Sequence, residues 1–116
     1  MNEYMLIYKG GDKNEMDDVT EEQMGAIMQK WGAWMEKLQK AGQLVSGGAP
    51  LDMEGKTLDE AGVVTDISTV EMKELVSGYS IIAAADIDAA IEIAKDCPIF
   101  TFPGKTIEVR EVIQID

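Results

Sequence analysis

The sequence predicts an α+β fold in which two helices cover one face of a four-stranded antiparallel sheet. Its 116 residues suit one domain with one modest core. Segments with strand-like and helix-like spacing follow one another in the order β, α, β, then β, α, β, and a short hairpin separates the two halves. This order is the split βαβ, or ferredoxin-like, arrangement, in which both helices lie on the same side of the sheet.

The first half contains two strands on either side of a long amphipathic helix. Residues 3–9 are apolar and aromatic and precede a glycine pair, which predicts a strand and a turn. Thr20 begins a capping box, TEEQ, and Gly42 is expected to end the helix. Residues 43–50 then predict a short strand that bends at a turn, Gly47-Gly48. Apolar residues recur at helical spacing and are expected to pack in the core rather than to bind a ligand: Met24, Ile27, Met28, Trp31, Trp34, Met35 and Leu38.

The second half repeats the strand, helix and strand after a small arm. Residues 55–66 have the rhythm of a β-hairpin. Residues 78–85 are β-branched and aromatic at their start, which predicts the third principal strand. Asp86 is expected to cap a short helix that Pro98 ends, because proline disfavours helical geometry in the residue before it. Residues 105–116 alternate well enough to predict a long last strand.

The strands are apolar on more sides than two helices can cover. In the first and third strands, both odd-numbered and even-numbered side chains are largely apolar, although successive side chains point to opposite faces. A sheet with one face in water would be polar at alternate positions. We therefore expect a second copy of the chain to cover the helix-free face, sheet against sheet, as an obligate homodimer that encloses a cavity.

One polar pair interrupts the apolar pattern on the helix-free face. Glu108 and Arg110 project from the last strand toward that face. A polar pair on an apolar concave wall is typical of a small-molecule site. The alternative is a structural ion pair, formed within one chain or across the dimer, because buried charges are normally paired.

Composition excludes several classes of function and disfavours others. A net charge of −12, spread along the chain, disfavours binding to nucleic acids and to anionic membranes. One cysteine, Cys97, allows no internal disulfide, so a cytoplasmic location is expected. The chain has no histidine, the commonest general base and a frequent metal ligand, so we expect no metal site and no cofactor.

The chain resembles the YCII-related proteins, and specifically their DGPF-domain branch. The resemblance rests on MQKWGAWMEKLQKAGQLVSGGAPL, on TDISTVEMKELVSGYSII, and on DIDAAIEIAKDCP with the later IEVR, in the family's order. It covers nearly the whole chain, so residues 1–116 are expected to form a single YCII-related domain. The resemblance implies a ferredoxin-like subunit that pairs into a dimeric α/β barrel. The apolar side chains on both faces of the strands independently predict a dimer.

Individual residues match the family's motifs, and some depart from them. The matching residues are Asp66, then Glu71, Lys73 and Glu74, then Gly78-Tyr79, and finally Glu108-Val109-Arg110. Ile67-Ser68-Thr69 stands where the branch has Gly-Pro-Phe, and Glu111 stands where it has proline. The wider family's suggested His–Asp catalytic pair has no counterpart, because this chain lacks histidine.

Three functions follow from these observations. The first is a homodimer that binds a small organic metabolite in the barrel, with Arg110 as charge partner if the metabolite is anionic. The second is an enzyme of lyase or isomerase type, with Asp66 or Glu108 as the general base, which would need desolvation to raise its pKa in order to act near neutral pH. The third is a structural or regulatory interaction domain. Candidate ligand-binding residues are Arg110, Glu108, Asp66, Glu71, Lys73 and Tyr79.

Overall fold

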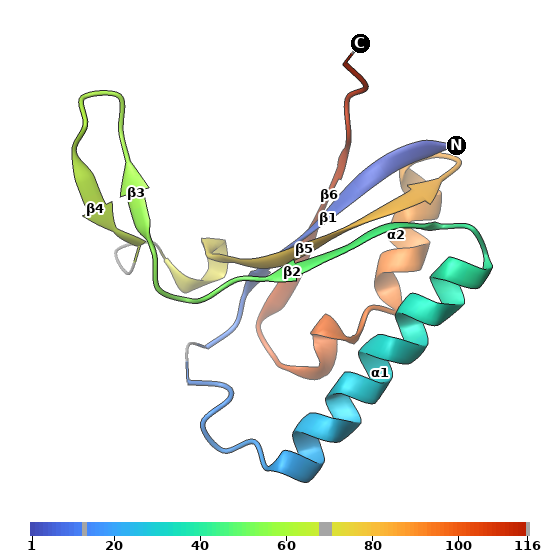
Figure 1. Cartoon of the computed structure of the whole chain (residues 1–116), viewed down its shortest axis with the longest axis horizontal. Helices are drawn as coiled ribbons and strands as arrows, with labels where there is room; N and C mark the ends of the chain where they lie inside the picture. The colour runs from blue at the N-terminus through green and yellow to red at the C-terminus, as the bar shows by residue number, and fades with distance from the viewer. Residues whose placement is uncertain (13, 68–70, 116) are drawn as a thin grey trace.

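The structure, a computed structural model, describes residues 1–12, 14–67 and 71–115 and contains a four-stranded antiparallel sheet with two helices on one face (Figure 1). The strand order is β2-β5-β1-β6. The principal elements are β1 (Asn2–Gly10), α1 (Glu21–Lys40), β2 (Leu44–Pro50), β5 (Val76–Ala84), α2 (Ile87–Lys95) and β6 (Lys105–Glu111). This arrangement confirms the predicted α+β class and the ferredoxin-like order of elements.

The predicted hairpin is also present, as a separate two-stranded sheet. Its strands are β3 (Lys56–Leu58) and β4 (Val64–Asp66). Two short 3₁₀ turns, η2 (Met72–Glu74) and η3 (Pro98–Thr101), precede β5 and β6. In Figure 1 the hairpin and the C-terminal residues both extend from the side of the sheet that faces away from the helices. No helix of the described chain is long and apolar enough to cross a membrane.

The core lies between the helices and the even-numbered side chains of β1 and β5. Leu6 and Ile82 are completely buried at its centre. From α1, Trp34 packs into it, and from α2 the small Ala90 lets the helix approach the sheet closely. Burying each large apolar side chain contributes about 1.5–3 kcal/mol, so this single layer of contacts fixes both helices to the sheet.

Local signals at the helix ends behave as the sequence indicates. The Thr20 hydroxyl accepts a hydrogen bond from the Gln23 N–H at 3.1 Å, and the Gln23 side chain accepts one from the Thr20 N–H at 2.9 Å. Gly42 follows α1 with φ +72°, the left-handed conformation that glycine adopts without strain. Asp86 caps α2 by accepting a hydrogen bond from the Ala89 N–H at 2.8 Å.

Three expectations differ from the structure. Gly47-Gly48 is not a turn: it lies inside β2, where the register with β5 shifts, and a Cβ on Gly48 would be 1.7 Å from the Tyr79 carbonyl oxygen. This is a bulge at which two backbones approach closely. Met28 is exposed, because the apolar stripe of α1 turns away from the core at that position.

The last strand is shorter than expected. It ends at Glu111, although the alternating pattern continues to the end of the chain. The Val112 N–H still donates to the Glu3 carbonyl at 2.8 Å, but β1 begins at Asn2, which lies opposite residue 113, so residues 114 and 115 have passed the end of β1. A strand needs a partner for its backbone groups, and within one chain the partner stops here.

Candidate functional site

The helix-free face has an apolar centre built from odd-numbered residues of β1 and β5. Met5 lies opposite Ile81 and Ile7 lies opposite Tyr79 in the antiparallel register. All four side chains are only partly buried, whereas the even-numbered residues between them are fully buried in the core. The prediction that both faces of these strands are apolar is therefore confirmed for the single chain, because large apolar side chains remain partly exposed on the side without helices.

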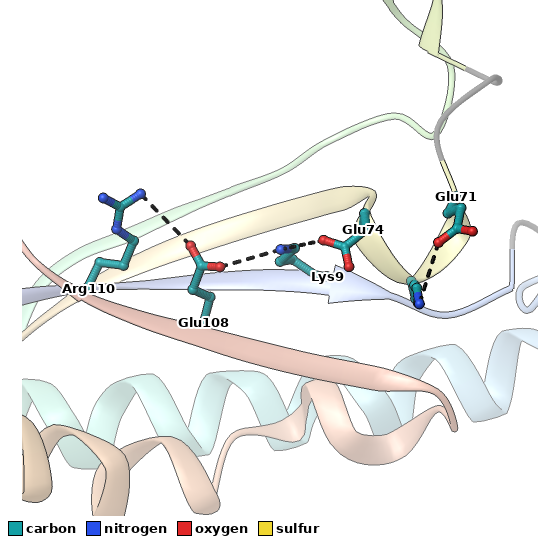
Figure 2. Close-up of polar contacts among 6 residues, drawn as sticks. Lys9, Glu71, Glu74, Glu108 and Arg110 are labelled. Carbon is teal, nitrogen blue, oxygen red and sulfur yellow. Dashed lines mark hydrogen bonds and ion pairs between the residues drawn. The ribbon is translucent and has the colours of Figure 1, made fainter.

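A row of charges runs along one edge of this apolar centre (Figure 2). Arg110 Nη1 lies 4.0 Å from Glu108 Oε2, and Glu108 Oε1 accepts a hydrogen bond from Lys9 Nζ at 3.4 Å. Lys9 Nζ also donates to Glu74 Oε2 at 3.0 Å. In the strand register Met5 lies opposite Arg110, and Ile7 lies opposite Glu108. The charges and the apolar centre therefore share one surface.

Lys9 is the least exposed charge in the row, and the sequence interpretation did not single it out. Its pKa is raised above the ordinary value of 10.5, chiefly by the hydrogen bond to Glu74; burial acts against this, and Glu108 adds to it. Lys9 is therefore a fixed ammonium rather than a base. The signal that could have found it is positional, because it continues the odd-numbered series Met5 and Ile7 along β1.

Arg110 extends from this face into solvent. Its side chain is 71% exposed, and Figure 2 shows its guanidinium standing above the strand beside Glu108. The guanidinium carries five N–H donors, and one carboxylate at 4.0 Å engages few of them. The two residues predicted from the sequence therefore lie side by side, and this contact leaves most of the guanidinium donors of Arg110 unengaged by Glu108.

The other candidates are distributed over neighbouring segments. Glu71 and Lys73 form an exposed ion pair of 3.5 Å, and Figure 2 shows Glu71 beyond Glu74, at the far end of the row from Arg110. Asp66 belongs to the hairpin, where it pairs with Lys56 across β3 and β4. Asp66 therefore lies on a different element from every charge in the row. In the altered motif Ile67-Ser68-Thr69, Ser68 and Thr69 lie outside the described residues.

The remaining reactive groups do not converge on this face. Cys97 is buried on the helix side, where burial raises the pKa of its thiol above the ordinary value, so it is a core residue and not a nucleophile. Among residues 1–12, 14–67 and 71–115, no three cysteine or acidic side chains gather as a metal ion would require.

Comparison with known proteins assigns the family. A comparison with curated proteins found no match. The model of the YCII-related domain family matches residues 2–116, which is essentially the whole described sheet, both helices and the hairpin. The same span holds the motifs that carried the resemblance, from the α1 region to the closing Glu108-Val109-Arg110. The chain belongs to the YCII-related domain family.

Proposed function

We propose that this protein is a homodimer that binds a small organic anion between the helix-free faces of its two subunits. The observation that carries the proposal is the composition of that face. An apolar centre lies next to a row of charges on one continuous surface. An apolar wall with a few placed polar groups is what small-molecule sites have in common.

Burial energy supports the dimer. Met5, Ile7, Tyr79 and Ile81 are already half covered in the single chain. Completing the burial of such a side chain contributes about 1 kcal/mol, and a two-fold dimer gains this twice for each residue. The face would otherwise expose these side chains to water over the middle of the sheet.

Charge supports an anionic ligand at Arg110. Lys9 is neutralised by Glu74 and Glu108, which both contact its ammonium. Arg110 has a single carboxylate neighbour at 4.0 Å and a planar donor set that matches a carboxylate in two parallel hydrogen bonds. A ligand with an apolar body would lie on Met5 and Ile81, the residues nearest Arg110 in the register, with its anionic group at the guanidinium.

The assembly is tested by measuring molar mass with light scattering at micromolar concentration. Wild type is expected to exceed the mass of one chain. Ile7→Lys, which places a charge in the apolar centre, should lower the mass, whereas Met28→Lys on the exposed surface of α1 should leave it unchanged. A wild-type mass of one chain, or equal masses for all three proteins, would contradict the dimer.

The ligand is tested by thermal shift with a panel of small carboxylates that carry apolar groups. A ligand that prefers the native state raises the melting temperature. Arg110→Ala should abolish the shift, and Lys37→Ala, which removes an equally exposed cation from α1, should keep it. A shift that survives Arg110→Ala would refute the proposed contact.

The same panel also distinguishes the two alternative functions. Turnover that disappears in Glu108→Gln while the thermal shift remains would identify an enzyme with a carboxylate base. A panel without any thermal shift would favour an interaction domain.

A further inference from the structure

The outer edge of β6 has no neighbouring strand in the described chain. β6 is last in the strand order, with β1 on its other side. Because the Val112 N–H bonds to β1, and antiparallel bonding alternates along a strand, even-numbered residues direct their backbone groups to β1. The N–H and C=O groups of Ile107, Val109 and Glu111 therefore point outward. A free edge of this kind is a template for another strand.

An apolar groove lies directly beside this free edge, on the helix side of the sheet. Its volume is about 520 Å³, and α2, η3 and β6 line it. Ile87, Ile91 and Phe100 stand in it with 39% to 47% of their surface exposed. The floor is Ile107 and Val109, the same residues whose backbone forms the edge. The edge and the groove thus form one surface that lacks a partner.

We propose that β6 pairs with β6 of a second copy, antiparallel, about a two-fold axis that passes through Val109. The charges of the strand select this register. An axis through Glu108 would place Glu108 opposite Glu108, and an axis through Arg110 would place two arginines opposite each other. An axis through Val109 places Glu108 opposite Arg110 twice, so both cross-strand pairs attract.

The same register places the end of the chain over the groove. β6 ends at Glu111, so the pair would extend the strand through residue 113 of the second copy, which would then lie opposite Lys105. Odd-numbered residues of β6 face the helix side, as Ile107 and Val109 do, so Ile113 of the extended strand would lie at the mouth of the groove. In the single chain Ile113 and Ile115 are 77% and 89% exposed.

The two-fold axis also brings the two copies of α2 together. It runs perpendicular to the sheet, so both copies keep their helices on the same side and Ile87 and Ile91 of each copy face the other copy. The arrangement places residues 112 and 113 opposite Thr106 and Lys105, the first two residues of β6 in the second copy. It uses the edge of the sheet and leaves the apolar centre of the helix-free face uncovered. Arg110 is the residue that it shares with the proposed ligand site, and Val109→Pro tests the pairing without changing that residue.

Sedimentation of three variants tests the pairing. Arg110→Glu would place Glu opposite Glu twice and is expected to halve the molar mass. Adding Glu108→Arg to it restores attraction and is expected to restore the wild-type mass. Val109→Pro removes an outward N–H without removing a bond to β1 and should also halve the mass. Circular dichroism confirms that each variant is folded.

The result separates the edge from the helix-free face. If both surfaces pair and their two-fold axes meet at a right angle, wild type has the mass of four chains, and Ile7→Lys and Arg110→Glu each reduce it to two. If the edge alone pairs, wild type has the mass of two chains and Ile7→Lys has no effect. An unchanged mass in both folded edge variants, or a double variant that fails to recover a mass halved by Arg110→Glu, would overturn the β6 pairing.

Discussion

At the scale of single residues, a buried ion pair fixes the loop that follows β1. Lys105 Nζ lies 2.8 Å from Glu15 Oε1, and the two side chains are 4% and 10% exposed. The same ammonium donates to the Gly10 carbonyl at 3.1 Å. Gly11 passes so close that a Cβ there would lie 2.6 Å from the Lys105 side chain. Lys105 therefore holds the start of β6 against the loop before α1 through an ion pair and a hydrogen bond.

Breaking that pair should be costly. Glu15→Gln leaves the Lys105 ammonium buried without its counter-charge, and the expected loss in the free energy of unfolding is about 3 kcal/mol. Urea denaturation measures it. Glu92→Gln, which removes an exposed ion pair with Lys95 on α2, is the control and should cost far less. Equal losses in the two variants would contradict this account of the loop.

A second residue-scale prediction concerns alkaline pH. Tyr8 donates a hydrogen bond to Ser80 at 2.7 Å inside the core, and burial raises its pKa well above the ordinary value of 10.0. The unfolded chain loses this proton near pH 10 while the folded protein keeps it, so stability that is complete below pH 10 falls as the pH rises further. Lys9, whose pKa is also raised, acts in the same direction.

Tyr8→Phe isolates the contribution of the phenol. The variant should be less stable at pH 7 by about 1 kcal/mol, because it loses a buried hydrogen bond. Between pH 10 and pH 12 its stability should fall less steeply than that of wild type, since one of the groups with a raised pKa no longer titrates. Urea denaturation at a series of pH values measures both effects. A variant that keeps the full wild-type slope would show that Tyr8 is not responsible.

Sequence reasoning found part of the candidate site, and the reason is geometric. Glu108 and Arg110 are two residues apart on one strand, so parity alone places them on the same face. Lys9 joins them through the pairing of β1 with β6, and the sequence does not state which strands are neighbours. Asp66 shares a motif with the others, yet it lies on the hairpin, whose direction no local rule determines.

At the scale of elements, the hairpin is the most independent part of the fold. β3 and β4 pair with each other and with no other strand of the described chain. The Ile67 N–H donates to the Gly55 carbonyl at 2.9 Å, so the two ends of the hairpin meet at its base. The exposed tip carries Leu58, Val63 and Val64, which contribute little to the core beneath the sheet.

Removing the hairpin should therefore leave the body of the protein folded. Replacing residues 56–66 with Asn-Gly joins two points that are already within hydrogen-bonding distance. The free energy of unfolding is expected to change by less than about 1 kcal/mol, as urea denaturation and near-UV circular dichroism would show. A variant that loses the near-UV signal of Trp31 and Trp34 would show that the hairpin supports the core.

Element types were predictable where one local pattern had one meaning. The capping residues Thr20 and Asp86 fixed the start of each helix, because few other arrangements satisfy the free N–H groups there. Gly47-Gly48 was misread because glycine serves turns and bulges equally. What decides between them is the approach of the Tyr79 carbonyl from β5, which is distant in sequence.

At the scale of the whole molecule, the chain is flat and extended. Its extents are 45 × 42 × 19 Å and its radius of gyration is 15.7 Å. A compact domain of this length has a radius of about 13 Å. The difference comes from a single sheet with helices on one side, and from the hairpin and C-terminal residues that extend beyond it (Figure 1). Such a slab has a large surface for its volume, which favours assembly.

Assembly should appear in the dependence of melting temperature on protein concentration. A native state that binds a second copy is stabilised by mass action, so the melting temperature of wild type should rise over a hundredfold increase in concentration. Differential scanning calorimetry measures this. Ile7→Lys is expected to weaken the dependence through the helix-free face. A melting temperature that stays constant over that range would argue against any stable contact between copies.

The closed base of the hairpin also determines where this chain tolerates changes of length. Since the Gly55 carbonyl and the Ile67 N–H span a gap that one hydrogen bond closes, the sheet is insensitive to how many residues loop out between them. An affinity tag or a fluorescent label inserted at residues 59–62 would extend into solvent without moving β5 or β2. Insertions at the same hairpin tip would allow relatives to acquire extra segments while they keep an identical sheet.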